Sequence, residues 1–172
     1  CLALPASLQA QTKFYHFPTA TPAGGANVIP FGTGGTGTWE NQRMQTVFPA
    51  TALSGKPGMV RTIGFAPTGT QPTYLFKALV VRIGHTTLTS PASTFEATYN
   101  VAGPVGTVVN EVNYSWKIVK PWSMIPLTKP WIYNGKSNLV IDIMTIGTNA
   151  NAKSGFHNAS SSPGMNRSYV FG

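Results

Sequence analysis

The chain has 172 residues, a length that fits one domain and that can bury a core without disulfides or metals. Only 9% of its residues are charged, against about 25% in an average protein, and Thr, Ser, Asn and Gln take their place. The net charge of +8 arises mostly because acids are scarce, and its cations are scattered along the sequence. A nucleic-acid interface needs grouped cations, so we expect no nucleic-acid partner, whereas weak attraction to anionic polysaccharide or membrane surfaces stays open.

The N-terminal ten residues, CLALPASLQA, are apolar and end on a small side chain. They are typical of the tail of a secretion signal, with Ala10 before the cut. Alternatively, residues 1–10 form an apolar arm, or Cys1 is a lipidated N-terminus. A single cysteine excludes an internal disulfide and a cysteine-based zinc site. No apolar run is long enough to span a bilayer, so we predict no transmembrane segment.

Residues 11–38 combine prolines and glycines with one short apolar piece, residues 27–31. Because proline cannot donate to a sheet ladder, this stretch is predicted to be an extended arm or linker with an edge strand. Such an arm can pair with the sheet edge of a second copy, fold back on its own domain, or stay disordered. The residues expected to make the assembly contacts are its apolar ones: Phe14, Tyr15, Phe17, Val28, Ile29 and Phe31.

Strand-like alternation recurs through the rest of the chain, and no window has apolar residues at helical spacing between capping residues. In the clearest strand, residues 74–83, one face carries Leu75, Leu79, Val81 and Ile83, with Lys77 as an exception. The other predicted strands are residues 42–48, 59–66, 105–109, 112–119, 123–127, 139–146 and 168–171. We therefore predict an all-β fold, a jelly-roll-like antiparallel β-sandwich of about 8–10 strands over residues 39–172.

The sequence offers no pattern for catalysis or metal binding. His16, His85 and His157 are far apart and have no acidic neighbour in sequence, so we predict no metal site and no cofactor. A Gly-x-Ser-x-Gly elbow is absent. A carboxylate pair for glycoside hydrolysis would have to join Glu96 with Glu111 or Asp142. We expect Asp142 instead to bond to backbone or to pair with an arginine such as Arg82, and no enzyme activity.

Aromatic side chains are the candidate ligand contacts, since sugar rings stack on aromatic faces. Trp122, Trp39, Tyr99 and Tyr133 form the candidate platform, and Trp122 sits in a predicted loop. Trp116 and Trp131 are expected in the core, because aromatic residues at alternating strand positions are usually interior.

Four segments carry a likeness to a known family: residues 43–49 (RMQTVFP), 60–67 (VRTIGFAP), 83–89 (IGHTTLT) with Phe95, and 130–143 (PWIYNGKSNLVIDI). In this order they resemble a domain of exported bacterial surface proteins of planctomycetes and Bacteroidetes. The resemblance covers about residues 28–171. It implies an extracellular β-sandwich and supplies no catalytic residues. Relatives often carry a C-terminal sorting signal that this sequence lacks, so we expect a stand-alone subunit.

These observations lead us to expect a non-catalytic extracellular or cell-surface structural protein. It would self-assemble into a homo-oligomer or polymer, a filament or surface layer, through its arm and exposed edges. The alternative is a carbohydrate-binding or adhesion module that binds polysaccharide through exposed Trp and Tyr side chains.

Overall fold

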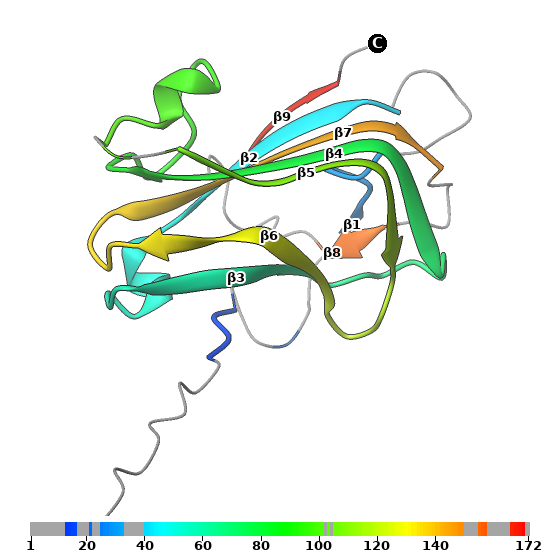
Figure 1. Ribbon diagram of the computed structural model, residues 1–172, viewed down its shortest axis with the longest axis horizontal. Coiled ribbons are helices and arrows are strands. Elements are labelled where there is room, and N and C mark those ends of the chain that lie inside the picture. The colour runs from blue at the N-terminus through cyan, green and yellow to red at the C-terminus, as the bar shows by residue number, and fades with distance from the viewer. Residues whose placement is uncertain are drawn as a thin grey trace, which may run out of the picture.

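The computed structural model describes residues 13–16, 21, 25–32, 40–101, 103, 105–149, 155–157 and 166–170. Nine strands and two short 3-10 helices occur in this part of the chain, and it contains no α-helix (Figure 1). The 3-10 helices are η1 (Ala50–Leu53) and η2 (Glu96–Thr98). The strands are β1 (Ala26–Asn27), β2 (Gln42–Phe48), β3 (Gly58–Phe65), β4 (Thr73–Thr86), β5 (Gly106–Lys117), β6 (Ser123–Tyr133), β7 (Asn138–Thr148), β8 (Phe156–His157) and β9 (Asn166–Val170).

The strands form two layers. A five-stranded antiparallel sheet in the order β5-β4-β7-β2-β9 makes one layer, and the antiparallel pair β3-β6 lies across its inner face (Figure 1). The small antiparallel pair β1-β8 brings residues 26–27 beside residues 156–157. The predicted all-β sandwich is therefore confirmed. No helix among the described residues is long and apolar enough to cross a membrane.

Two strands differ from the sequence prediction. The pieces 105–109 and 112–119, expected to be separate, form the continuous strand β5. β6 extends to Tyr133 although it contains Pro126 and Pro130. Among the described strands its backbone pairs with β3 alone, and a strand with one unpaired edge tolerates prolines.

β4 changes its buried face at Lys77. Before this residue Tyr74 and Phe76 are buried, and after it Leu79 and its alternate neighbours are buried. The predicted face is therefore wrong at Leu75, which is 48% exposed. The strands on either side bend at the same place, where Asn113 and Gly147 have positive φ angles of 52° and 59°. Lys77 is not an exception within a buried face, because the face itself switches there.

Phe31 lies at the centre of the core. Its side chain is fully buried, and its ring centroid lies 4.8 Å from those of Trp116 and Phe156. Trp116 and Phe156 are stacked with an angle of 3° between their planes. The carbonyl of Pro30 accepts a hydrogen bond of 2.9 Å from Thr145 on β7. The apolar piece at residues 27–31 thus completes the core of its own chain.

Candidate functional site

The outer face of the five-stranded sheet, which points away from β3 and β6, is partly covered by the loop of residues 87–105. η2 lies in this loop, above β4 and β5 (Figure 1). Tyr99 packs its ring directly on Gly84 of β4, where any Cβ atom would overlap the ring. Glycine is therefore needed at this position so that the ring can lie flat on the strand.

Asp142 of β7 anchors this loop. It is 2% exposed and pairs with Arg43 of β2 through two contacts, Nη2 to Oδ2 at 2.7 Å and Nε to Oδ1 at 3.1 Å. Gln45 Nε2 and the Tyr99 hydroxyl both donate to Oδ2 at 3.0 Å. The expectation that Asp142 pairs with an arginine is confirmed, but the partner is Arg43 and not Arg82. Arg82 is the backbone neighbour of Asp142 on β4.

Groups of the loop close over the same arginine. The Arg43 guanidinium lies 4.2 Å from the centre of the Phe95 ring, and its Nη1 lies 3.3 Å from Glu96 Oε1. Gln45 Nε2 also donates to the Phe95 carbonyl at 2.8 Å. Asp142 and its hydrogen bonds raise the pKa of Arg43 above its ordinary value. Burial, and then the charge of Asp142, raise the pKa of Tyr99 well above its ordinary value near 10.

In this polar cluster the charged groups pair with one another and fix the loop to the sheet. Glu96 and Asp142, a carboxylate pair that a glycosidase would need, are indeed brought to one place, but Arg43 lies between them. Asp142 is also enclosed by Gln45 and Tyr99, so a substrate cannot reach its oxygens. Among the described residues, no three His, Cys, Asp or Glu side chains gather to hold a metal ion.

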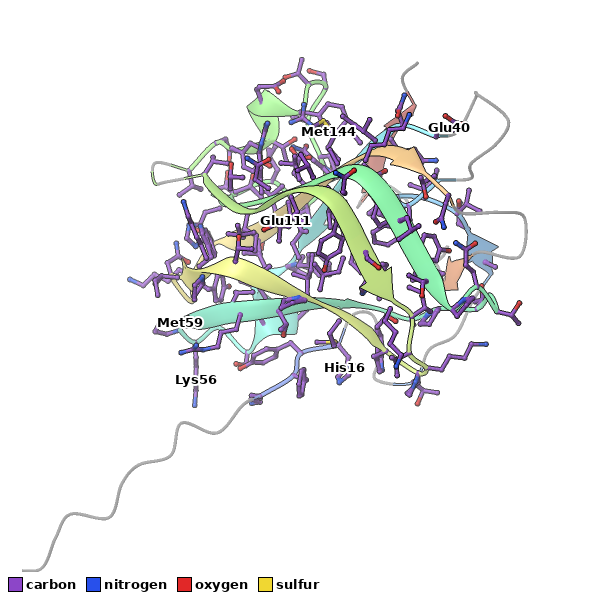
Figure 2. The ribbon with its side chains drawn as sticks, turned by 45° about the vertical axis from the view of Figure 1, so that its right-hand side comes forward. His16, Glu40, Lys56, Met59, Glu111 and Met144 are labelled. Carbon is purple, nitrogen blue, oxygen red and sulfur yellow. The ribbon has the colours of Figure 1, made fainter. Side chains whose placement is uncertain are left out.

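Beyond the loop, part of the outer face of the sheet carries apolar side chains that no other described segment covers. The strand register places Val112, Ala78 and Ile146 in one row across β5, β4 and β7. The next row holds Val80 and Met144, and Figure 2 shows Met144 on the upper surface. Val112 is 76% exposed and the other four side chains are half-buried. We call these five residues the apolar rows.

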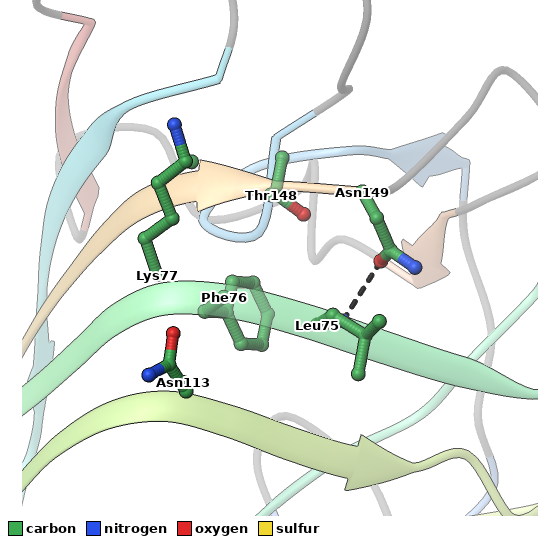
Figure 3. Close-up of a pocket in the computed structure, with 7 residues that line it drawn as sticks. Leu75, Phe76, Lys77, Asn113, Thr148 and Asn149 are labelled. Atoms are coloured by element: carbon green, nitrogen blue, oxygen red, sulfur yellow. Dashed lines mark hydrogen bonds between the residues drawn. The ribbon is translucent and has the colours of Figure 1, made fainter.

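An open groove of about 270 Å³ follows the bend of β4 (Figure 3). Lys77 runs along it and passes so close to Gly147 that a Cβ atom there would meet its side chain. Asn149 Oδ1 accepts the Leu75 N–H at 2.8 Å, so this amide stabilises the bend. Its lining contains one cation and no acid, and Thr148 is its one buried polar side chain.

The candidate platform residues do not come together. Tyr133 is 4% exposed and donates its hydroxyl to the Ser137 carbonyl, and Tyr99 belongs to the polar cluster. Trp122 is half-buried, with its ring 5.0 Å from that of His16, and Trp39 lies outside the described residues. Trp116 and Trp131 are buried, as predicted.

The predicted arm residues divide into three groups. Phe31 is in the core, and Val28 and Ile29 are half-buried beside it. Phe14 is 57% and Tyr15 44% exposed, and the Tyr15 hydroxyl bonds to Ser54 Oγ at 2.9 Å. Phe17 lies outside the described residues.

His85 is a half-buried histidine with structural contacts. Its Nε2 accepts the Asn134 N–H at 3.1 Å, and its ring packs 4.4 Å from that of Trp131. Burial lowers its pKa. These contacts need the neutral ring, since only a deprotonated Nε2 can accept a hydrogen bond.

The sequence analysis missed Arg43 and Gln45. Two features of the sequence pointed to these residues. Arg43 and Gln45 lie on the same face of an alternating strand, and the predicted strand at residues 139–146 carries a single carboxylate, Asp142. No family model, no curated protein and no solved structure matches this chain.

Proposed function

We propose that this chain is a non-catalytic structural protein that self-assembles with further copies through the apolar rows. The observation that carries the proposal is the uncovered apolar surface of Val112, Ala78, Ile146, Val80 and Met144 on the largest sheet. Contiguous exposed apolar surface on a sheet marks an interaction site.

A second copy is the occupant that this surface fits. The two rows contain no charged residue on β4, β5 or β7, and Arg43, at the β2 end of the second row, is neutralised by Asp142 and Glu96. The rows of two copies can therefore meet without like-charge repulsion between them, as the self-complementary surface of an isologous pair, with Arg82, the next outward residue of β4, at their edge. On β5 the second row continues to Asn110, whose neutral amide can form hydrogen bonds at the rim of the contact.

The amino-acid composition supports a location outside the cell. A surface with 9% charged residues and abundant hydroxyl and amide groups is typical of exported β proteins. We accordingly assign the chain to the extracellular space or the cell surface, as part of a filament or layer.

Assembly through the arm would use only its first part. Phe31 already fills the core of its own chain, so exchange of this residue would empty that core. Among the described arm residues, Phe14 and Tyr15 keep free surface. The sheet face therefore contributes more to the proposed contact than the arm.

The test is the mass in solution of wild type and Val112→Lys, measured by light scattering across a concentration series. Wild type is expected to grow in mass with concentration, and Val112→Lys to remain a monomer, because each interface would bury two unpaired ammonium groups. Val119→Lys is the matched control, since Val119 is 52% exposed outside the apolar rows. A wild type that stays monomeric at high concentration contradicts the proposal.

A further inference from the structure

The opposite side of the sandwich has a different surface chemistry. Of the eight large hydrophobic side chains that are exposed among the described residues, four belong to β3, β6 and the neighbouring segment 13–16: Phe14, Tyr15, Met59 and Ile132. Met59 and Ile132 are direct cross-strand partners at 49% and 62% exposure. Tyr15 is held to this side by its bond to Ser54, four residues before the start of β3. These four apolar side chains therefore lie on the same side of the molecule, and we call them the apolar patch.

Cations surround this patch. Lys13 lies 5.2 Å from the centre of the Tyr15 ring, and Arg61 is exposed where β3 is bulged. Lys56 and Lys136 are exposed on two turns that touch each other, because a Cβ atom at Gly135 would overlap the backbone of Lys56 and Pro57. Figure 2 shows Lys56, Met59 and His16 together on the lower side of the molecule, with Glu40 and Glu111 above them.

No acid neutralises these cations. All four acids of the chain, Glu40, Glu96, Glu111 and Asp142, lie outside β3, β6, their turns and segment 13–16. Both ion pairs found among the described residues belong to Arg43 on the other sheet. We define Phe14, Tyr15, Met59 and Ile132 with Lys13, Lys56, Arg61 and Lys136 as the basic apolar face.

We propose that the basic apolar face binds the surface of an anionic lipid bilayer. Its four apolar side chains enter the interfacial region, where aromatic and aliphatic groups gain from leaving water, and its cations contact the phosphates of the headgroups. The contact is peripheral, made by side chains of a folded sheet and its neighbouring segment.

The charge of the face excludes a second copy as its occupant. Two basic apolar faces in contact would bring eight cations together with no acid between them, and such like-charge contact costs several kcal/mol. A hydrated polyanion would satisfy the cations but would gain little from Met59 and Ile132, which protrude as aliphatic groups. A bilayer supplies both a negative surface and an apolar layer a few ångströms below it.

Vesicle co-sedimentation tests the two components separately. Wild type is expected to sediment with phosphatidylcholine vesicles that contain phosphatidylglycerol, and to remain in solution with pure phosphatidylcholine. Lys56→Gln combined with Arg61→Gln lowers the partition coefficient about fivefold per cation. Lys117→Gln, an exposed cation on β5, leaves it within twofold. Equal sedimentation of wild type with both vesicle types contradicts the proposal.

The apolar component distinguishes a bilayer from a soluble polyanion. Met59→Ser with Ile132→Ser is expected to reduce vesicle binding at least tenfold while the thermal midpoint stays within a few degrees, because both side chains are exposed. If this variant binds vesicles as wild type does, and dextran sulfate competes fully, the partner is a polyanion and the lipid proposal is wrong.

A position-specific label provides a readout that does not depend on affinity. On a Cys1→Ser background, Met59→Cys carrying a nitrobenzoxadiazole dye is expected to shift its emission to the blue on anionic vesicles. The same dye attached to Val112→Cys, on the opposite sheet, is expected to show no shift in its emission. The reverse pattern would assign the lipid contact to the apolar rows and overturn the proposal.

Discussion

Two buried clusters stabilise this protein by different physics. The rings around Phe31 lie between the sheets and contact one another in many orientations, from a T-shaped pair with Phe65 to the parallel stack of Trp116 and Phe156. The groups around Asp142 lie under the loop of residues 87–105 and depend on single hydrogen bonds. Ring packing adds many small contributions that are lost in proportion to the atoms removed, whereas a buried ion pair becomes unfavourable when one member is lost.

The largest effect is expected in the aromatic cluster. Phe31→Ala removes a fully buried ring and should lower the free energy of unfolding by about 3–5 kcal/mol, through lost burial and the cavity left behind. Urea denaturation followed by tryptophan fluorescence measures it. Phe14→Ala, at a site that is 57% exposed, is the control and should change stability by less than about 0.5 kcal/mol. A loss below about 1 kcal/mol at Phe31 would place this ring outside the core.

In the polar cluster, Asp142→Asn should lower the free energy of unfolding by about 2–3 kcal/mol, because Arg43 loses its buried charged partner and keeps only the exposed Glu96. Arg43→Met combined with Asp142→Asn should recover part of this loss, since no buried unpaired charge remains. The same denaturation assay gives the coupling energy. Strict additivity of the two single losses would mean that the pair does not act as a unit.

The smallest effect separates the hydroxyl of Tyr99 from its ring. Because burial raises the pKa of Tyr99 in the folded protein, its contribution to stability is complete below pH 10 and is lost as the pH rises above that value. Tyr99→Phe should cost about 1.5 kcal/mol at neutral pH and make the alkaline decline shallower. Part of the decline should remain, since burial also raises the pKa values of Tyr114 and Tyr133.

Thermal unfolding between pH 8 and pH 11 measures this decline. Tyr15→Phe, at an exposed tyrosine, should follow the wild-type curve. An unchanged slope in Tyr99→Phe would show that Tyr99 does not keep its proton in the folded state.

The sequence predicted the elements of the fold well where strands alternate regularly. β2 has the bounds that its pattern indicated, and the core positions of Trp116 and Trp131 followed from their place on alternating strands. The face switch at Lys77 could not be read from β4 alone. It depends on Asn113 and Gly147, which belong to neighbouring strands and become adjacent to Lys77 only after pairing.

The polar cluster and Phe31 were hidden for a related reason. Asp142 meets Arg43 because β7 lies between β2 and β4, and the sequence did not specify this order. It favoured Arg82, which is the partner on β4, whereas the side chain of Arg43 reaches Asp142 from one row away on β2. Phe31 lies among prolines and glycines that predict an exposed arm, but its ring contacts Phe76, Trp116 and Phe156 from three distant segments. Local patterns carry little information on such contacts.

The central position of Phe31 has a consequence for synthesis of the protein. One of its neighbours, Phe156, is synthesised more than a hundred residues after Phe31, so Phe31 emerges from the ribosome long before the core can close. During that time the ring of Phe31 is available to chaperones. Nascent chains stalled before Phe156 should therefore retain a chaperone-binding segment that chains stalled after it have lost.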